Sequence, residues 1–417
     1  MTSMYTINYA LRAHKRDPFI EFIKGMLMTP FVLHAKPIPH DPLEKEDGLV
    51  EECVMDSNVA RYCDILSSIE ELINEHIRKQ IKGVPDQSRL RRLVPSVSTF
   101  HTKLPLRESF LLANAKHSIA ARRFVPPSFN DIRRILNTAQ IIAIAPKLKL
   151  ITFDGDMTLY DDGKDFEQDS ELVNLLVRLL KCDLIVCVVT AAGYSGDSER
   201  YEQRLSGLLK GFQTAKLPKE ICNRFYLLGG ECNYLFQCQE DYHLKYIPEE
   251  EYQPEYIRTW SEEQIKAILD VAQENLQRCV DDMKLPCTVM RKSKAVGLVP
   301  EQNVKIFREQ LDECVLSSQH RIVSFLKLSG KKNSLPFCAF NGGCDVWVDI
   351  GNKLIGVQIL QEFLGATPAE TLHVGDQFLS TGNDYATRHQ CCTLWIVNPE
   401  ETQNVLIELL EAKKPET

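Results

Sequence analysis

Short apolar segments that alternate with an amphipathic helix limit the fold of this chain more than any other feature. Residues 148–153 and 184–189 are apolar runs of strand length, and an amphipathic helical pattern at 171–181 lies between them. Two further short apolar runs follow at 372–374 and 393–397. Strands that are apolar on both faces and alternate with helices are typical of a parallel sheet covered on both sides. We therefore predict an α/β protein with a Rossmann-like parallel sheet as its core.

The first 145 residues have a different character, because apolar residues recur in them at helical spacing. Asp17 and Pro18 have the form of a helix N-cap followed by a first-turn proline. The same spacing continues over 59–82, and a third helical pattern has Asn130 as its expected N-cap. We expect residues 1–145 to form a helical N-terminal region separate from the sheet.

A long insertion separates the first part of the sheet from the second. About 150 residues lie between Thr190 and Asn341, whereas one crossover needs only about a dozen. Charge-rich helical patterns and short strand patterns fill this stretch, at 260–283, 301–313, 225–228 and 288–291. We expect a cap domain at 196–340, inserted into a catalytic core formed by 146–195 and 341–417.

Composition excludes several classes of protein. A net charge of −8 argues against a broad nucleic-acid-binding face. The N-terminus lacks the pattern of a signal peptide, and no run approaches the roughly 18 apolar residues that a membrane helix needs. The 14 cysteines are scattered without a C-x-x-C pair, which is typical of reduced thiols. We expect a cytoplasmic protein that binds neither nucleic acid nor a membrane.

Polar side chains follow three of the predicted strands at the point where each strand ends. Asp154 and Asp156 come after the first apolar run, Thr190 after the second and Asp376 after the third. Ligands of open parallel sheets bind beyond the carboxyl ends of the strands, so these side chains are expected to share one site. Lys353 follows another apolar segment and adds an ammonium group to the set.

The chemistry of this set predicts a Mg²⁺-dependent phosphohydrolase. Neighbouring carboxylates repel one another unless a cation lies among them, and ligation by oxygen alone suits Mg²⁺. Asp154 is placed to attack phosphorus, and Asp156, two residues on, is placed to act as the acid and base. Thr190 and Lys353 supply a hydroxyl donor and a positive charge for the phosphoryl group.

Each residue also has a structural explanation when it is considered alone. A D-x-D-x-T pattern arises by chance in roughly one of every ten to twenty chains of this length. Thr190 alone is consistent with a helix N-cap, and Lys353 alone with a solvated surface lysine. The order of the whole set after buried strands favours catalysis. Asp384 remains open between a second metal carboxylate and a structural acceptor.

The set resembles the haloacid dehalogenase superfamily of aspartate-nucleophile phosphatases. Several longer motifs are similar to the IMP-specific 5′-nucleotidases of fungi and apicomplexan parasites. They read FDGDMTLYDDG at 153–163, NGG at 341–343 followed by Asp345, WVDIGNK at 347–353, GDQFLSTGND at 375–384 and YALRAHKRD at 9–17. The resemblance covers most of the chain.

This resemblance implies a role for each matching residue. Asp154 would be the nucleophile and Asp156 the acid and base, and both would contact the substrate. Mg²⁺ would be held by Asp154, the backbone carbonyl of Asp156 and Asp376. Thr190 and Lys353 would bind the phosphate of IMP. The candidates for nucleoside contacts are Asp162 and Asp345, although a turn explains the first and a strand edge the second.

The resemblance further implies a homotetramer and regulation by ATP through residues 1–145. The sequence itself shows only that this region is helical and rich in Lys and Arg, without a P-loop. Arg200 and Arg204 lie within chain reach of Thr190, where they face either the substrate or solvent. Three alternative functions remain open: a phosphatase of another nucleotide or sugar phosphate, a nucleoside phosphotransferase, and a non-catalytic nucleotide sensor.

Overall fold

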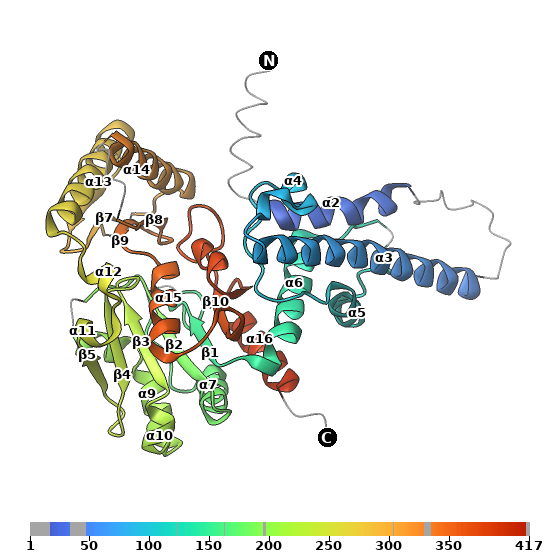
Figure 1. Ribbon diagram of the computed structural model, residues 1–417, viewed down its shortest axis with the longest axis horizontal. Coiled ribbons are helices and arrows are strands. Elements are labelled where there is room, and N and C mark those ends of the chain that lie inside the picture. Colours follow the sequence, from blue (N-terminus) through green and yellow to red (C-terminus); the bar gives the residue numbers. More distant parts are fainter. Residues whose placement is uncertain are drawn as a thin grey trace. The chain divides into compact units, whose positions relative to one another are not determined.

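The computed structural model describes residues 17–33, 47–122, 124–161, 163–194, 197–302, 304–328 and 335–413. The chain divides into two compact units, which can be followed by colour in Figure 1. One unit contains Met1–Lys147 and Ile407–Thr417, and the other contains Leu148–Leu406. Asp162 and residues 9–16 of the N-terminal motif lie outside the described residues.

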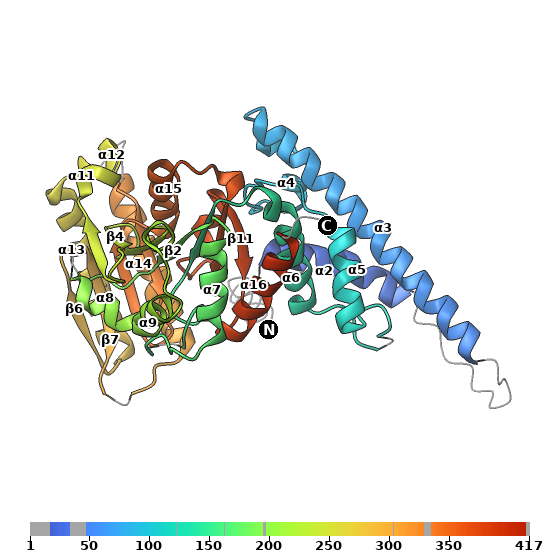
Figure 2. The same cartoon turned by 90° about the horizontal axis from the view of Figure 1, so that it is seen from below.

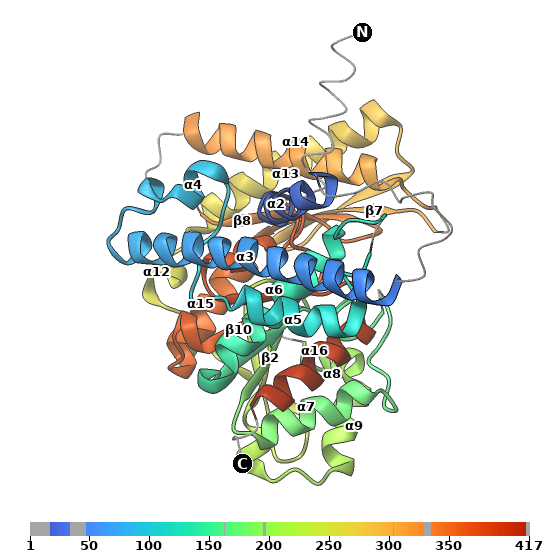
Figure 3. The ribbon, with the colours of Figure 1, turned by 90° about the vertical axis from the view of Figure 1, so that its right-hand side faces the viewer.

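The described part of the first unit consists of helices. Helix α3 packs against α2 and α5, and both of these also contact α6 (Figure 3). Leu66 and Ile73 of α3, Phe110 of α5 and Ile132 of α6 are fully buried. The bounds are α2 (Pro18–Leu33), α3 (Asp47–Ile81), η1 (Pro85–Gln87), α4 (Arg89–Leu93), α5 (Leu106–His117), α6 (Phe129–Ile144) and η2 (Ala145–Lys147).

Two helix caps in this unit were predicted, and one of the predictions is wrong. Asp17 caps α2 as expected, since its Oδ1 accepts a hydrogen bond of 2.9 Å from the backbone N–H of Ile20. Helix α6 is capped by Ser128 and not by Asn130. Ser128 Oγ accepts from the N–H of Asp131, and Asp131 Oδ2 accepts from the N–H of Ser128. This reciprocal capping box satisfies two backbone donors, which Asn130 alone cannot do.

A seven-stranded sheet forms the core of the second unit and confirms the predicted α/β architecture. Its strand order is β11-β10-β1-β2-β3-β4-β5. Neighbouring strands from β11 to β3 pair in parallel, whereas β4 pairs antiparallel with both β3 and β5. The bounds are β1 (Leu150–Phe153), β2 (Ile185–Val189), β3 (Phe225–Gly229), β4 (Tyr234–Cys238), β5 (Leu244–Ile247), β10 (Thr371–Gly375) and β11 (Cys392–Trp395).

Helices pack against this sheet, and strand β2 contacts both α7 (Glu171–Lys181) and α15 (Lys353–Leu364) (Figure 2). Cys187 and Val189 of β2 share a buried cluster with Ile359 of α15. The strands are buried nearly throughout, as their continuous apolar sequences predicted. The other elements of this unit are α8 (Ser198–Arg204), α9 (Ser206–Thr214), α10 (Lys219–Cys222), α11 (Glu249–Tyr252), α12 (Glu255–Arg258), η3 (Pro368–Glu370) and η4 (Tyr385–His389). Helix α16 (Pro399–Ala412) begins in this unit, and its residues from Ile407 onward belong to the first unit.

A second sheet of four antiparallel strands lies in the same unit, with the order β6-β7-β9-β8. Helices α13 (Glu262–Met283) and α14 (Arg308–Leu328) pack on it through a shared apolar cluster (Figure 1). Helix α14 begins later than the predicted start at residue 301. The strands are β6 (Cys287–Arg291), β7 (Ala295–Pro300), β8 (Phe337–Asn341) and β9 (Val346–Ile350).

The second sheet does not follow the expected cap boundaries of 196–340. Strand β3 pairs in parallel with β2, with Phe225 opposite Val186, so the chain returns to the large sheet before it enters the small one. Strand β9 lies beyond residue 340 but pairs with β7 in the small sheet. Residues 225–247 of the expected cap therefore belong to the large sheet, and strand β9, expected in the core, belongs to the small sheet. Within the described ranges, no helix combines the length and apolar character needed to cross a bilayer.

Candidate active site

Three neighbouring strands bring the predicted site residues to one edge of the large sheet. Asp154 follows β1, Thr190 follows β2 and Asp376 follows β10, and β1 lies between the other two strands. Lys353 comes from a different part of the fold, because the strand that precedes it, β9, belongs to the small sheet. It is the first residue of α15, whose N-cap Asn352 accepts a hydrogen bond of 2.9 Å from the N–H of Ile355.

Lys353 forms the centre of the site because its ammonium joins two buried carboxylates. Its Nζ lies 2.7 Å from Oδ1 of Asp154 and 2.6 Å from Oδ1 of Asp384. The side chains of Lys353 and Asp384 have no exposed surface. Burial raises the pKa of Asp154 to about 7, against the opposing effect of Lys353. The lysine stays charged, since Asp154 and Asp384 raise its pKa despite its burial.

Asp384 accepts hydrogen bonds from three groups of the protein. Its Oδ1 accepts hydrogen bonds from Nζ of Lys353 and, at 3.0 Å, from Nε2 of His373. Its Oδ2 accepts a hydrogen bond of 2.9 Å from the N–H of Gln377. Although burial favours the protonated acid, Lys353 and His373 hold the pKa of Asp384 well below its usual range. Nδ1 of His373 is 2.8 Å from Oγ1 of Thr152, which fixes the ring. Of the two roles left open, this geometry favours the structural acceptor.

The acidic groups at this edge fit a divalent cation. Carboxylate oxygens of Asp154, Asp376 and Asp384 lie within 4.8 Å of one another. Oδ1 of Asp376 is buried and has no hydrogen-bond partner among the described residues. Burial, followed by the charges of Asp154 and Asp384, raises the pKa of Asp376 well above its usual value. A cation relieves both the repulsion and the unsatisfied oxygen, and oxygen ligands of this kind suit Mg²⁺.

Asp156 is partly exposed and forms an ion pair with Arg204. Its Oδ1 accepts hydrogen bonds of 2.8 Å from Arg204 and 3.1 Å from the N–H of Gly163. Arg204 lies 5.3 Å from the ring centre of Tyr160 and lines the pocket described below. Arg200, in contrast, is 67% exposed and pairs with Asp197 of its own helix end. The two arginines that the sequence left open therefore differ in position.

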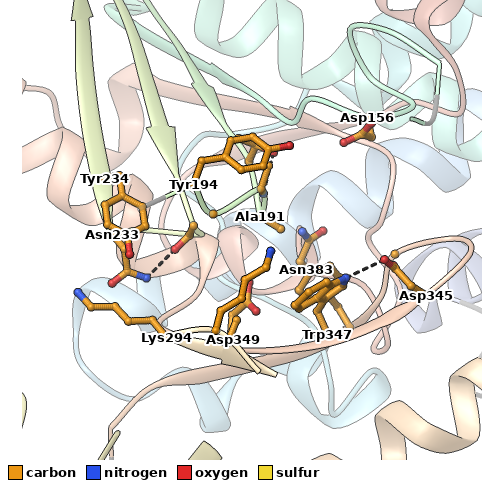
Figure 4. Close-up of a pocket in the computed structure, with 18 of the residues that line it drawn as sticks. Asp156, Ala191, Tyr194, Asn233, Tyr234, Lys294, Asp345, Trp347, Asp349 and Asn383 are labelled. Carbon is orange, nitrogen blue, oxygen red and sulfur yellow. Dashed lines mark hydrogen bonds between the residues drawn. The ribbon is translucent and has the colours of Figure 1, made fainter. Parts of the chain in front are cut away.

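A cavity of about 290 Å³ opens at Asp154 and Thr190 and extends between the two sheets. Thr190 is buried, and its Oγ1 accepts a hydrogen bond of 3.2 Å from the N–H of Ala192. From the small sheet, Asp345, Trp347 and Asp349 all line the cavity (Figure 4). They are alternate residues, so they share the face of the strand that points toward the site.

The wall of the cavity formed by the small sheet combines an aromatic ring with charged groups. Nε1 of Trp347 donates a hydrogen bond of 2.7 Å to Oδ2 of Asp345, drawn as a dashed line in Figure 4. Nζ of Lys292 lies 4.1 Å from the centre of the Trp347 ring. Lys294 and Arg204 also line the cavity. A cavity that contains the Trp347 ring and the cationic groups of Lys292, Lys294 and Arg204 suits a ligand with a planar ring and an anionic group.

Several residues of the site were not identified from the sequence. Trp347 and Asp349 could have been predicted, because they alternate with apolar residues in a strand and therefore share one face of it. Lys292 could not have been predicted, because it lies in a polar turn and only the folded structure brings it to the cavity. Glu231 and Asn383 lie next to the site, and both are buried.

Comparisons with known proteins agree along nearly the whole chain. Residues 1–406 match the model of the family described as IMP-specific 5′-nucleotidase. The chain is 43% identical to IMP-specific 5′-nucleotidase 1 of Yarrowia lipolytica, over 99% of this chain and 98% of that one. It is also 43% identical to the protein of the same name from Neurospora crassa, with the same coverage.

Solved structures of a Plasmodium falciparum IMP-nucleotidase are also similar. The N-terminally truncated, IMP-bound form has a TM-score of 0.83 at 36% identity and covers 95% of this chain and 96% of its own. The ATP-bound form has a TM-score of 0.80 at 36% identity, covering 99% of this chain and 89% of its own.

Proposed function

Because this chain belongs to the IMP-specific 5′-nucleotidase family, we propose that it hydrolyses IMP to inosine and inorganic phosphate at Asp154. The observation that carries this proposal is the contact of 2.7 Å between Lys353 and Asp154 at the inner end of the cavity. A buried carboxylate held by an ammonium, beside an acidic cluster, is the arrangement that a phosphate-attacking aspartate needs.

Asp154 acts as the nucleophile in this proposal. Both Lys353 and the N–H of Gly155, at 2.8 Å, bind its Oδ1, which leaves Oδ2 as the attacking atom. A bond forms between Oδ2 and phosphorus while the bond from phosphorus to the 5′ oxygen of IMP breaks. Water then cleaves the aspartyl-phosphate and releases inorganic phosphate, which regenerates the carboxylate.

Asp156 moves the protons. It gives a proton to the 5′ oxygen of the leaving inosine and then takes one from the attacking water. Its carboxylate is 37% exposed and is bound to Arg204, so it has to exchange Arg204 for the leaving oxygen during the reaction. Thr190 donates to a phosphoryl oxygen, and Lys353 offsets the negative charge that develops on the phosphoryl group.

A magnesium ion fits the remaining acidic groups. Asp154, Asp376 and the backbone carbonyl of Asp156 would hold it, and the ion would supply positive charge against the phosphoryl oxygens. The unsatisfied Oδ1 of Asp376 supports this assignment.

The nucleoside occupies the outer part of the cavity in this proposal. Asp345 contacts it from the small sheet, and Trp347 provides an apolar face for the purine ring. Asp162, which is outside the described residues, is a further proposed contact. The IMP-bound Plasmodium structure supports IMP as the substrate.

Regulation and assembly are also proposed. The ATP-bound Plasmodium structure supports ATP as an effector of this chain, acting through the helical region 1–145. The family resemblance supports a homotetramer. We assign the small sheet with its two helices to the cap and place the protein in the cytoplasm.

One assay tests the reaction and the substrate together. Phosphate release is measured from IMP, AMP, GMP and sugar phosphates, in Mg²⁺ and in chelator, with and without ATP. Release from IMP that is much faster than from the others, and that chelator abolishes, supports the proposal. Equal rates on all substrates would contradict IMP specificity. New nucleotide formed when nucleoside is added in excess would favour the phosphotransferase alternative.

A further inference from the structure

Glu231 is a fully buried acid beside the site that has no role in the proposed reaction. It lies in a sharp turn after β3, where Gly230 and Glu231 both have positive φ, of 58° and 65°. A left-handed conformation is unfavourable for a residue with a side chain, so other contacts must stabilise this turn. The Glu231 side chain is therefore placed at some cost in stability.

The backbone of this turn contacts two other segments of the site. The N–H of Glu231 donates a hydrogen bond of 3.0 Å to the carbonyl of Thr190. Its own carbonyl faces α15 at Gly356, where an added Cβ would lie 2.5 Å from the carbonyl oxygen. Gly356 is three residues after Lys353, so the turn packs on the helix end that carries the lysine. Any side chain at 356 would push these two segments apart.

The side chain of Glu231 reaches a third segment. Its Oε1 accepts a hydrogen bond of 3.0 Å from Nδ2 of Asn383. Asn383 is directly followed by Asp384, the carboxylate that lies 2.6 Å from Lys353. A continuous series of contacts thus runs from Glu231 through Asn383 and Asp384 to Lys353, and from there to Asp154.

We propose that Glu231 is a positioning residue: its uncharged carboxyl group pairs with the carboxamide of Asn383 and so holds Asp384 and Lys353 in place against Asp154. The proposal rests on the function proposed above. Glu231 does not touch the reacting atoms in it. It acts on the rate through the position of the ammonium.

The uncharged form follows from two oxygens. Oε2 of Glu231 and Oδ1 of Asn383 are both buried, and neither has a hydrogen-bond partner within the described chain. Two acceptors cannot bond to each other, but a proton on Oε2 satisfies both at once. Together with the bond from Nδ2 to Oε1, it closes a cyclic pair of acid and amide. Buried acceptors without a hydrogen bond destabilise a fold, so the protonated pair is favoured over the ionised one.

The burial of Glu231 favours the same form, and the acids around it act in the same direction. Burial raises its pKa to about 7, against the opposing effect of Lys353. The other charged groups near it are Asp154, after β1, and Asp384, after β10, and both favour the protonated acid. From the small sheet, Asp349 of β9 also interacts with it unfavourably when both are ionised. The thiols of Cys232 and Cys338 are next to it and are kept neutral by burial.

Four variants of the full chain test the pair, with IMP and Mg²⁺ as the assay. Glu231→Gln is expected to keep kcat within about threefold, since a second carboxamide reproduces both hydrogen bonds of the cyclic pair. Glu231→Ala and Asn383→Asp are expected to lower kcat by about 10- to 100-fold with a smaller change in KM, as for other groups that orient a reacting residue. Combining Glu231→Gln with Asn383→Asp exchanges acid and amide, and kcat is expected to recover at least about fivefold over Asn383→Asp alone.

A matched control separates positioning from loss of stability. Asn275→Ala deletes a buried carboxamide in the small-sheet region that bonds to Oγ of Ser318 at 3.1 Å. This variant is expected to lower the thermal midpoint but not kcat. If Glu231→Gln is as inactive as Glu231→Ala while its thermal midpoint matches the wild type, the charge is required and the proposal is wrong. Turnover of IMP by the wild type tests the proposed function separately, because the proposal concerns only ratios between variants.

Discussion

The ammonium of Lys353 lies 2.7 Å from Oδ1 of Asp154, and the lysine side chain has no surface exposed to water. A charge buried in this way is tolerated because Asp154 and Asp384 both compensate it. Lys353 is therefore shared by two buried acids, and its removal leaves both of them without the ammonium that compensates them.

Lys353→Met is expected to damage both activity and stability. We expect kcat to fall at least about 100-fold, and the free energy of unfolding in urea to fall by about 3 kcal/mol or more. Lys149→Met is the control, because Lys149 is 58% exposed and solvent weakens its pair with Glu370 at 2.7 Å. Similar losses of stability in the two variants would contradict the central role of Lys353.

Asp154→Asn is expected to abolish phosphate release, by at least about 1,000-fold, because an amide does not attack phosphorus at a useful rate. Acid quenching of the wild type during turnover of IMP labelled in its phosphate should trap labelled protein, and the variant should trap none. Circular dichroism is expected to show an unchanged fold. Turnover that persists in Asp154→Asn would reject the aspartyl-phosphate.

Asp376→Asn and Asp384→Asn are expected to differ in their dependence on Mg²⁺. The first removes a proposed ligand, so the Mg²⁺ concentration for half-maximal rate should rise about tenfold or more. The second removes the negative charge that lies 2.6 Å from Lys353, so kcat should fall while that concentration stays within about twofold. Titration of Mg²⁺ against the rate for both variants distinguishes the roles. A shared shift would make Asp384 a metal ligand.

Asp345→Ala is expected to raise KM for IMP about tenfold with little change in kcat. Asp345 lines the outer cavity and holds Trp347 through a hydrogen bond of 2.7 Å, so its loss weakens nucleoside binding and leaves the reacting groups in place. Steady-state kinetics on IMP and on ribose 5-phosphate provide the measurement. An equal effect on both substrates would show that Asp345 does not contact the base.

Glu231→Gln is expected to stabilise the fold relative to the wild type as the pH rises. The folded pKa of Glu231 is raised from its ordinary 4.5 to about 7 by burial, so the folded state keeps its proton over a range in which the unfolded chain has lost it. The wild type therefore loses stability between about pH 4.5 and 7, and the variant lacks this loss at position 231. The difference in free energy of unfolding should grow across this window and stay constant above it. A difference that does not depend on pH would contradict the raised pKa.

The sequence predicted the part of the site that lies at the ends of parallel strands. Asp154, Thr190 and Asp376 follow buried apolar runs, and strand ends that share an edge leave few other arrangements. Lys353 was also predicted because it follows an apolar segment, but that strand belongs to the other sheet, so the argument from a shared sheet edge does not explain its position. Sequence spacing does not predict how the strands of one sheet lie relative to those of another.

Glu231 was missed for a related reason. The strand before it, β3, has the same apolar pattern as the other core strands, but the charge-rich helices around it suggested a cap. Had β3 been assigned to the parallel sheet, the residues after it would have been expected at the same edge as Asp154. Strand pairing over long stretches of chain decides such assignments, and local composition carries little information about it.

The short distance along the chain from β9 to α15 has a mechanical consequence. Trp347 and Asp349 form a wall of the cavity, and Lys353 follows only four residues after Asp349. In the proposed reaction, recognition of the nucleoside and activation of its phosphate thus depend on side chains of one short segment, 347–353. A phosphate ester too short to reach Trp347 lacks the contacts at one end of this segment. Such a substrate is expected to bind its phosphate yet react slowly, so selectivity would be expressed in turnover as well as in affinity.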